Sequence, residues 1–109
     1  MSDSENVLTM ELNPATAGRL LAEIAHDSSR VLITHHAEER MTARHITRTQ
    51  VGRCLKHGKF TEGPYRSAKG NWQFTIEVVS AGELLTVAGA LDWQEKLGNY
   101  VVVITAYLG

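Results

Sequence analysis

Residues 72–78, with the sequence WQFTIEV, decide the fold class. Apolar side chains at Trp72, Phe74 and Ile76 alternate with polar ones, and this period of two is typical of a strand that buries one face. N-terminal to this stretch, apolar residues recur every three to four positions, which is the period of an amphipathic helix. We therefore predict helices first, and strands from Lys59 onward.

Three more segments complete the predicted sheet. Residues 84–91 and 100–107 are nearly continuous apolar runs, as expected for central strands. Residues 60–65 contain Gly63-Pro64 and are predicted to lie at an edge, because proline cannot donate to a strand ladder. The turns between the strands are predicted at 68–71, 80–82 and 96–99. The pattern predicts a four-stranded antiparallel meander.

Helix starts are marked by residues that satisfy free backbone N–H groups. Asn13-Pro14 is typical of an N-cap followed by the first helical residue. Thr34 or His35 can cap a second helix that ends near Ala43. Thr47 and Gln50 have the spacing of a capping box, and they open a third helix that stops at Gly58. Residues 31–33 are too short to be more than an extended connector.

The predicted architecture is α+β, with two to three N-terminal helices packed on one face of a four-stranded antiparallel sheet. We predict a flexible tail over residues 1–12 and a single domain over residues 13–109. The other face of the sheet is left for solvent or a ligand.

Composition narrows the function classes. The chain has 109 residues, 43% of them hydrophobic, and a formal net charge of −1, so no global basic excess indicates nucleic-acid binding. Cys54 is the single cysteine, which excludes an intramolecular disulfide, and its apolar helical surroundings favour a core thiol over a nucleophile. Neither a signal peptide nor a spanning segment is recognisable, so we expect a cytoplasmic protein without membrane contact.

Charge is distributed unevenly along the chain. The first 27 residues are acidic, whereas the segment from Arg40 to Lys59 carries six Lys or Arg residues and no Asp or Glu. This asymmetry predicts a local basic patch in the middle of the chain despite the near-zero total.

Three residues of the second helix form what we call the cationic stripe: His36, Arg40 and Arg44. They are spaced i, i+4, i+8 and therefore lie along one side of a helix. No Asp or Glu lies three or four residues from either arginine, so the helix itself does not neutralise them. The counter-charge is predicted to be a distant carboxylate or a bound anion.

The segment 33–58 together with the last strand resembles a known family. His36-Ala37, Arg40-Met41 and Arg44, followed by the closing Thr105-Ala106-Tyr107, resemble the bacterial domain-of-unknown-function family numbered 4258. The resemblance covers residues 31–108. That family has been proposed to share the fold of barnase, EndoU, colicin E5 and RelE, which are metal-independent ribonuclease toxins.

The resemblance implies a metal-independent endoribonuclease of the toxin type. In such an enzyme His36 moves a proton, Arg40 and Arg44 clamp the phosphate, and Thr105 and Tyr107 add polar groups from the same sheet face. The implied partners are the phosphate backbone of RNA and an acidic antitoxin or immunity-type protein. No cofactor or metal is expected, because adjacent histidines such as His35-His36 point about 100° apart on a helix.

Other interpretations of the same residues stay open. The arginines can instead pair with distant carboxylates such as Glu62, Glu77 or Glu83, with His36 only capping the helix. The cationic stripe can also belong to a non-catalytic module that binds nucleic acid or an acidic protein. The strand aromatics Trp72, Phe74 and Tyr65 are interpreted as core rather than as a stacking platform for bases.

Overall fold

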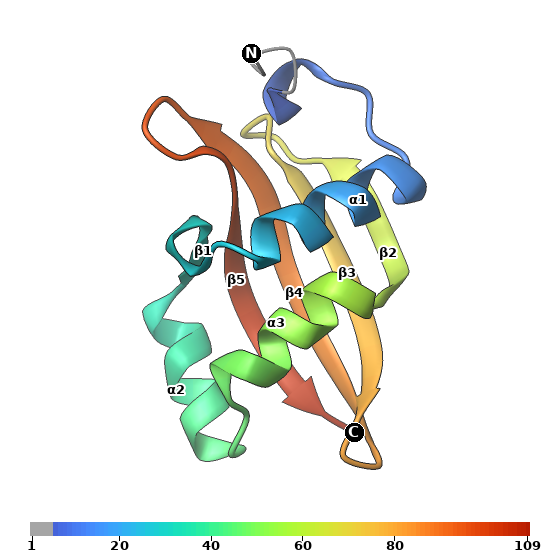
Figure 1. The fold of residues 1–109 in the computed structure, drawn as a ribbon, viewed down its shortest axis with the longest axis vertical. Helices are drawn as coiled ribbons and strands as arrows, with labels where there is room; N and C mark the ends of the chain where they lie inside the picture. The colour runs from blue at the N-terminus through green and yellow to red at the C-terminus, as the bar shows by residue number, and fades with distance from the viewer. Residues whose placement is uncertain (1–5) are drawn as a thin grey trace.

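Helices cover one face of a single sheet, and the opposite face is open (Figure 1). The structure, a computed structural model, describes residues 6–109. Its helices are α1 (Pro14–Ala25), α2 (His35–Ala43) and α3 (Arg48–His57), with short 3-10 helices η2 (Val7–Thr9) and η3 (Ser28–Arg30). Its strands are β1 (Val31–Ile33), β2 (Lys59–Arg66), β3 (Trp72–Ser80), β4 (Glu83–Gln94) and β5 (Gly98–Leu108). The predicted α+β class is confirmed.

The sheet has five strands in the order β1-β5-β4-β3-β2, so the prediction of four antiparallel strands was wrong. The strands β2 to β5 do form the antiparallel meander, and β2 lies at the edge as predicted. The segment 31–33, predicted to be a connector, pairs parallel to β5 with Val31 opposite Val101. Three residues are too few to show a period of two, so this non-local pairing left no sequence signal.

Side-chain caps place the helices where the sequence predicts. The Asn13 side chain accepts the Thr16 N–H at 2.8 Å, and the Thr34 hydroxyl accepts the Ala37 N–H at 3.0 Å. The predicted capping box forms, since Thr47 Oγ1 accepts the Gln50 N–H at 3.1 Å while Gln50 Oε1 accepts the Thr47 N–H at 2.8 Å. Three helix starts are therefore determined by local chemistry.

The core lies between the helices and the sheet. Leu20, Leu21 and Ile24 of α1 are buried against it, and Val51, Cys54 and Leu55 of α3 are buried beside them. From β3, Trp72 and Phe74 are 5% and 2% exposed, so their interpretation as core aromatics is confirmed. For Tyr65 the same interpretation was wrong, because this residue of the edge strand β2 is 50% exposed.

A β-bulge changes which side chains of β5 face the core. The register pairs Ala88 with Thr105 but Gly89 with Val103, which leaves Ile104 as the extra residue. A Cβ atom on Gly89 would lie 2.7 Å from the Val102 carbonyl oxygen and 3.1 Å from Phe74 Cζ, so glycine is required there. Beyond the bulge Ala106 is buried, and its neighbours in β5 project from the open face.

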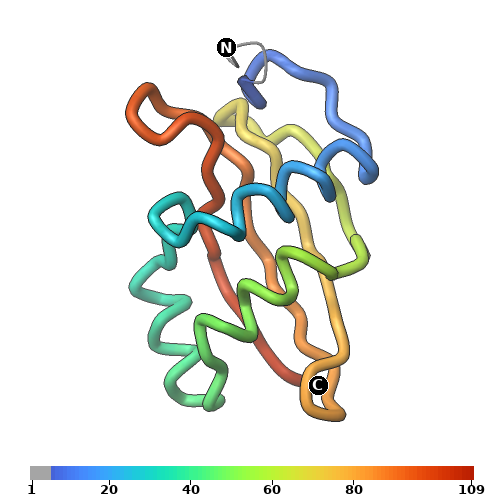
Figure 2. Tube along the Cα trace, in the orientation of Figure 1, coloured from blue at the N-terminus to red at the C-terminus, as the bar shows by residue number. Residues whose placement is uncertain are grey.

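Part of the segment predicted to be a flexible tail is folded against the sheet. Residues 1–5 lie outside the described residues, but Val7 is fully buried. Its N–H donates to Asn99 Oδ1 at 3.0 Å, and its carbonyl accepts from Trp72 Nε1 at 2.7 Å. Arg66 lies 4.3 Å from the centre of the Trp72 ring and donates to the carbonyl groups of Leu8 and Met10. Residues 6–12 thus lie at one end of the sheet, opposite the C-terminus (Figure 2).

Replacing Asn99 tests this docking. Asn99→Ala leaves the buried Val7 N–H without its acceptor and is expected to lower the free energy of unfolding by about 1–3 kcal/mol. Gln94→Ala on the same β4–β5 hairpin is the control and should change it by less than about 0.5 kcal/mol. Urea unfolding of both variants gives the comparison, and equal stability of the two would contradict the assignment.

Candidate functional site

Helix α2 is fixed to β5 at both of its ends. Before its first turn, the Thr34 N–H donates to the Val103 carbonyl at 3.2 Å. After its last turn, Arg44 Nη1 donates to the Ala106 carbonyl at 3.0 Å. The helix therefore runs alongside the C-terminal half of β5, beyond the three residues of that strand that pair with β1.

The contacts of α2 show which way the cationic stripe faces. Ala37 is buried against the sheet, and successive residues are separated by about 100°, so His36 and Glu38 project to opposite sides of it. On one side Glu38 Oε1 lies 3.6 Å from Arg48 Nη2 of α3. The cationic stripe is therefore on the side of α2 that faces away from α3, and Arg44 at its end reaches β5.

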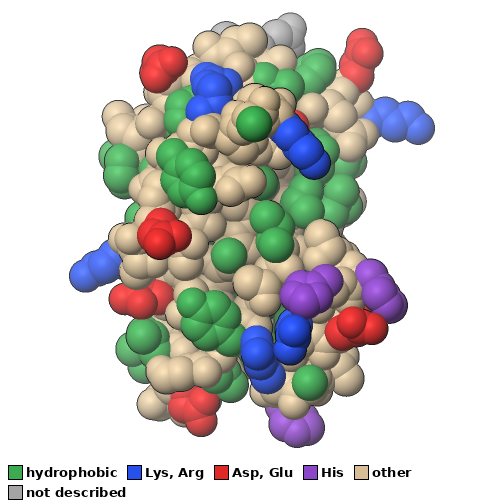
Figure 3. Space-filling view, turned by 180° about the vertical axis from the view of Figure 1, so that it is seen from behind, with side chains coloured by type: hydrophobic (Ala, Val, Ile, Leu, Met, Phe, Trp, Pro, Cys, Tyr) green, Lys and Arg blue, Asp and Glu red, His purple; other side chains and the backbone are tan. Residues whose placement is uncertain are grey.

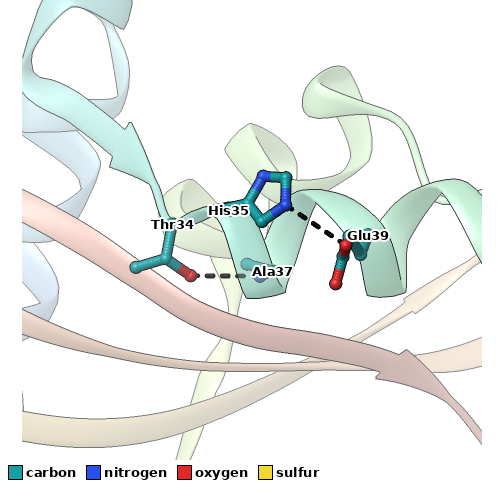
Figure 4. A network of polar contacts seen from close by, with 4 residues as sticks. All are labelled: Thr34, His35, Ala37 and Glu39. Atoms are coloured by element: carbon teal, nitrogen blue, oxygen red, sulfur yellow. Dashed lines mark hydrogen bonds and ion pairs between the residues drawn. The ribbon is translucent and has the colours of Figure 1, made fainter.

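His35, which directly precedes His36 in the sequence, lies on another side of α2. His35 Nε2 is 3.2 Å from Glu39 Oε2, and both side chains are on the solvent side of the helix, 89% and 65% exposed (Figure 4). His36 is also exposed but lies on the side that Arg40 and Arg44 share. The two imidazoles therefore belong to different surfaces, and His36 is the one beside the arginines.

The arginines of the cationic stripe have no carboxylate partner among residues 6–109. The side chains of Arg40 and His36 make neither a hydrogen bond nor an ion pair with any described residue, and the one hydrogen bond of the Arg44 side chain is to a carbonyl oxygen. Glu62, one of the distant carboxylates considered as a partner, accepts from Thr75 Oγ1 at 3.4 Å instead. Within the described chain, the charge of the two guanidinium groups is left for solvent or a ligand.

Thr105 and Tyr107 project from the open face of β5. They flank the buried Ala106, whose carbonyl accepts from Arg44, and Tyr107 is 43% exposed. Histidine and Lys or Arg side chains gather on this side of the molecule, at the edge beside which α2 lies (Figure 3). The structure thus brings Arg44 into contact with the strand that carries Thr105 and Tyr107.

The five residues do not form a closed pocket. Neither Thr105 nor Tyr107 is hydrogen-bonded to a residue of the cationic stripe in the described structure. A cavity of about 500 Å³ opens on the same face near the β2–β3 turn and ends at Ile104, and none of the five residues lines it. Sequence reasoning missed Ile104 and the bulge, for which Gly89 within an apolar strand was the available signal.

Cys54 is a core thiol, as predicted. It is fully buried, and burial, with a smaller contribution from the charge of Glu77, raises the pKa of its thiol from the ordinary value to about 12. Its thiolate is therefore scarce at neutral pH, which excludes a role as nucleophile in this conformation. Among the described residues, no three His, Cys, Asp or Glu side chains gather closely enough to hold a metal ion.

The basic run from Arg40 to Lys59 is divided between two surfaces. Arg40 and Arg44 belong to the cationic stripe, whereas Arg53, Lys56 and His57 are exposed on α3, beyond the Glu38 side of α2. The single basic patch predicted from the sequence is thus two patches that face different directions.

Comparison with known proteins gives one match. A family model described as Domain of unknown function (DUF4258) matches residues 33–108, which include α2 and all of β5. The chain belongs to this family. No curated protein and no solved structure matches it. The DUF4258 region starts at the end of β1 and thus contains the cationic stripe, Thr105 and Tyr107, but not α1. None of the helices in residues 6–109 has the length and apolar character needed to cross a membrane.

The state of Cys54 is testable by alkylation. The buried, protonated thiol of the native DUF4258 protein is expected to react with iodoacetamide near pH 8 at least about 100-fold more slowly than the same thiol in guanidinium chloride. Mass spectrometry measures the rate without ambiguity, because Cys54 is the single cysteine. Similar rates in the two states would show that the thiol is accessible and ionisable.

Proposed function

We propose that this DUF4258 protein is a metal-independent endoribonuclease of the toxin type, whose site is the cationic stripe together with the open face of β5. The observation that carries the proposal is the pair of arginines beside an exposed histidine, with no carboxylate partner among the described residues. Anionic RNA phosphate supplies the missing counter-charge.

Each residue has a defined task in this chemistry. The 2′-hydroxyl of RNA attacks the adjacent phosphorus, which forms a 2′,3′-cyclic phosphate and releases the 5′-oxygen of the next nucleotide. His36 takes the proton from the 2′-hydroxyl or gives one to the leaving 5′-oxygen, because an imidazole ring can both accept and donate a proton. Arg40 and Arg44 bind the phosphate oxygens as their negative charge increases.

Arg44 is held in place for this task. A guanidinium group has five N–H donors, and the Ala106 carbonyl accepts from Arg44 Nη1 only. The remaining donors are available to a phosphate, while the hydrogen bond to β5 limits the conformations of the side chain before RNA binds. Thr105 and Tyr107, on either side of Ala106, supply hydroxyl groups next to the same point of β5.

Two further considerations support the proposal. The resemblance of the family to the barnase, EndoU, colicin E5 and RelE group implies helices followed by a sheet whose open face cuts RNA. In the DUF4258 chain the three α-helices precede the four strands of the meander, with only the short β1 before α2, and one sheet face is open. Because one fold serves many functions, these considerations favour the endoribonuclease only in combination with the residues of the cationic stripe.

A second candidate function is a non-catalytic module that binds RNA or an acidic protein through the cationic stripe. The observation that favours it is the absence of a hydrogen bond between the His36 imidazole and any described residue, because no contact within residues 6–109 fixes the ring as a catalytic group requires. Cleavage assays distinguish the two functions.

Substitution of the two adjacent histidines tests catalysis. His36→Ala is expected to lower the rate of RNA cleavage by about 10²- to 10⁴-fold, the range for loss of a general acid or base. His35→Ala is the matched control, because His35 lies one residue away but on the solvent side beside Glu39. Labelled RNA incubated with purified protein and EDTA gives the rates and shows whether the products end in 2′,3′-cyclic phosphate.

The possible results separate the functions. Loss of activity in His36→Ala alone supports the endoribonuclease. Equal cleavage by wild type and His36→Ala would assign the activity to another group or to a contaminant. RNA binding without cleavage by the wild type would favour the binding module.

The arginines are tested by the salt dependence of binding to single-stranded RNA. Arg40→Ala should weaken binding and reduce the slope of log K against log salt by about 0.7, because one phosphate contact is lost. Arg44→Ala should weaken binding similarly but also lower the free energy of unfolding, since the Ala106 carbonyl loses its donor. Arg53→Ala on α3 is the control, and an equal effect of all three variants would contradict a specific role of the cationic stripe.

A further inference from the structure

A second cationic surface lies on the outer side of α3. Between α3 and the segment that joins α1 to β1 there is a groove of about 530 Å³, which we call the α3 groove. Its lining includes Arg48, Gly52, Arg53, Lys56 and His57 from α3, with Ser28 on the other side. These α3 residues extend from its first residue to its last, so the groove is about 15 Å long at 1.5 Å per residue.

The α3 groove is positively charged without local compensation. None of the residues that line it is Asp or Glu. Arg48 is 3.6 Å from Glu38 of α2, but the side chains of Arg53, Lys56 and His57 make no hydrogen bond or ion pair with any described residue. A ligand with several negative charges is therefore complementary to the groove.

The floor of the α3 groove is apolar. A pit of about 80 Å³ opens from it, lined by the apolar residues Val31, Ile33, Val51 and Ala25, by Gly52, and by Ser28 and Arg48, which also line the groove. This volume is less than that of three water molecules in the liquid, which occupy about 30 Å³ each. The pit therefore has the size of one small aliphatic side chain. The α3 groove thus combines a hydrophobic anchor point with a cationic rim.

Gly52 points independently to a ligand. Glycine is, after proline, the residue least favourable inside a helix, and Gly52 lies in the middle of α3. A Cβ atom added there would have no neighbour within 4 Å, so packing in this chain does not require glycine. The missing side chain keeps both the groove and the pit open, and glycine is typical where a ligand approaches a backbone closely.

We infer that the α3 groove binds a short acidic peptide segment of a partner protein, anchored by one aliphatic side chain in the pit. An extended segment of about five residues spans the length of α3 at 3.3 Å per residue. Its Asp or Glu side chains pair with Arg53, Lys56 and His57. A peptide fits better than RNA, because RNA bases stack on aromatic side chains and no Phe, Tyr or Trp lines the groove. This inference does not depend on the proposed ribonuclease activity, since the groove is separated from the cationic stripe by the Glu38 side of α2.

Selection from a library of random seven-residue peptides displayed on phage tests the inference with the intact chain. Wild-type protein is expected to enrich peptides in which Asp or Glu flanks Val, Ile or Leu. The double variant Arg53→Glu/Lys56→Glu should not enrich them, because both substitutions reverse the charge of exposed side chains. Fluorescence anisotropy of one enriched peptide should show binding weakened by at least about 10-fold in that variant.

Two matched variants complete the design. Gly52→Ala should raise the thermal midpoint, since alanine favours the helix, and yet weaken peptide binding by about 10-fold because its methyl group narrows the groove. Arg40→Ala, on the cationic stripe, should leave peptide binding unchanged. A higher midpoint with unchanged peptide binding would mean that Gly52 has no role in the groove.

Other outcomes overturn the inference. The inference is wrong if the wild type enriches no peptides beyond those that the double variant enriches, or if the enriched peptides lack Asp and Glu. It is also wrong if a 12-nucleotide single-stranded RNA displaces the peptide. Direct binding of that RNA to the wild type that is lost in Arg53→Glu/Lys56→Glu would instead identify the α3 groove as a nucleic-acid surface. Circular dichroism of each variant confirms that it is folded before binding is compared.

Discussion

The β-bulge at Ile104, beside the closely packed Gly89 of β4, determines which residues of β5 reach the open face. A side chain at position 89 would collide with the Val102 carbonyl and with the ring of Phe74, and at this point β5 contains one extra residue, Ile104. If β5 alternated regularly through Ile104, Thr105 and Tyr107 would instead share the face of Val101 and Val103, which is the core. The bulge turns the hydroxyl groups of β5 outward and directs Ala106 inward. The candidate site therefore depends on a constraint inside the sheet, far in sequence from the cationic stripe.

The position of α2 divides the positive charge of the chain. Its buried Ala37 and Met41 pack on the sheet, one side contacts α3 through Glu38 and Arg48, and the other side carries the cationic stripe. Residues that are close in sequence are thus presented in two directions. Two cationic surfaces that face different ways can bind two ligands at once, which a single patch cannot do. The near-zero net charge of the chain conceals both of them.

Local chemistry accounts for what the sequence predicted correctly. The caps at Asn13, Thr34 and Thr47 and the alternation in β3 involve residues at most four apart, so they can be recognised without the fold. Pairings between distant segments could not be recognised in this way. β1 pairs with residues seventy positions away, and the docking of Val7 depends on Trp72 and Asn99.

The candidate site, too, could be predicted from the sequence only where its features are local. The i, i+4 spacing of the cationic stripe, and the lack of carboxylates near it on its helix, are visible in the sequence. Whether a carboxylate from another element neutralises the arginines is a property of the folded chain, and among residues 6–109 none does. The hydrogen bond from Arg44 to the Ala106 carbonyl likewise depends on the placement of α2 beside β5.

Hydrogen bonds fix both ends of the short helix α2, so an anion that binds its side chains meets a helix already in position. The Thr34 cap fixes its start, and after Arg44 the backbone turns through His45, with φ of 58°, while the Ile46 N–H donates to the Met41 carbonyl at 2.9 Å. Two arginines four residues apart on such a helix repel each other by about 0.2–0.5 kcal/mol. A glutamate at position 40 would instead attract Arg44, so selection for stability alone does not favour the observed pair. An anion bound between Arg40 and Arg44 would remove this repulsion. It would need no change in the backbone, because hydrogen bonds at both ends of α2 already fix the position of the helix that carries the two residues.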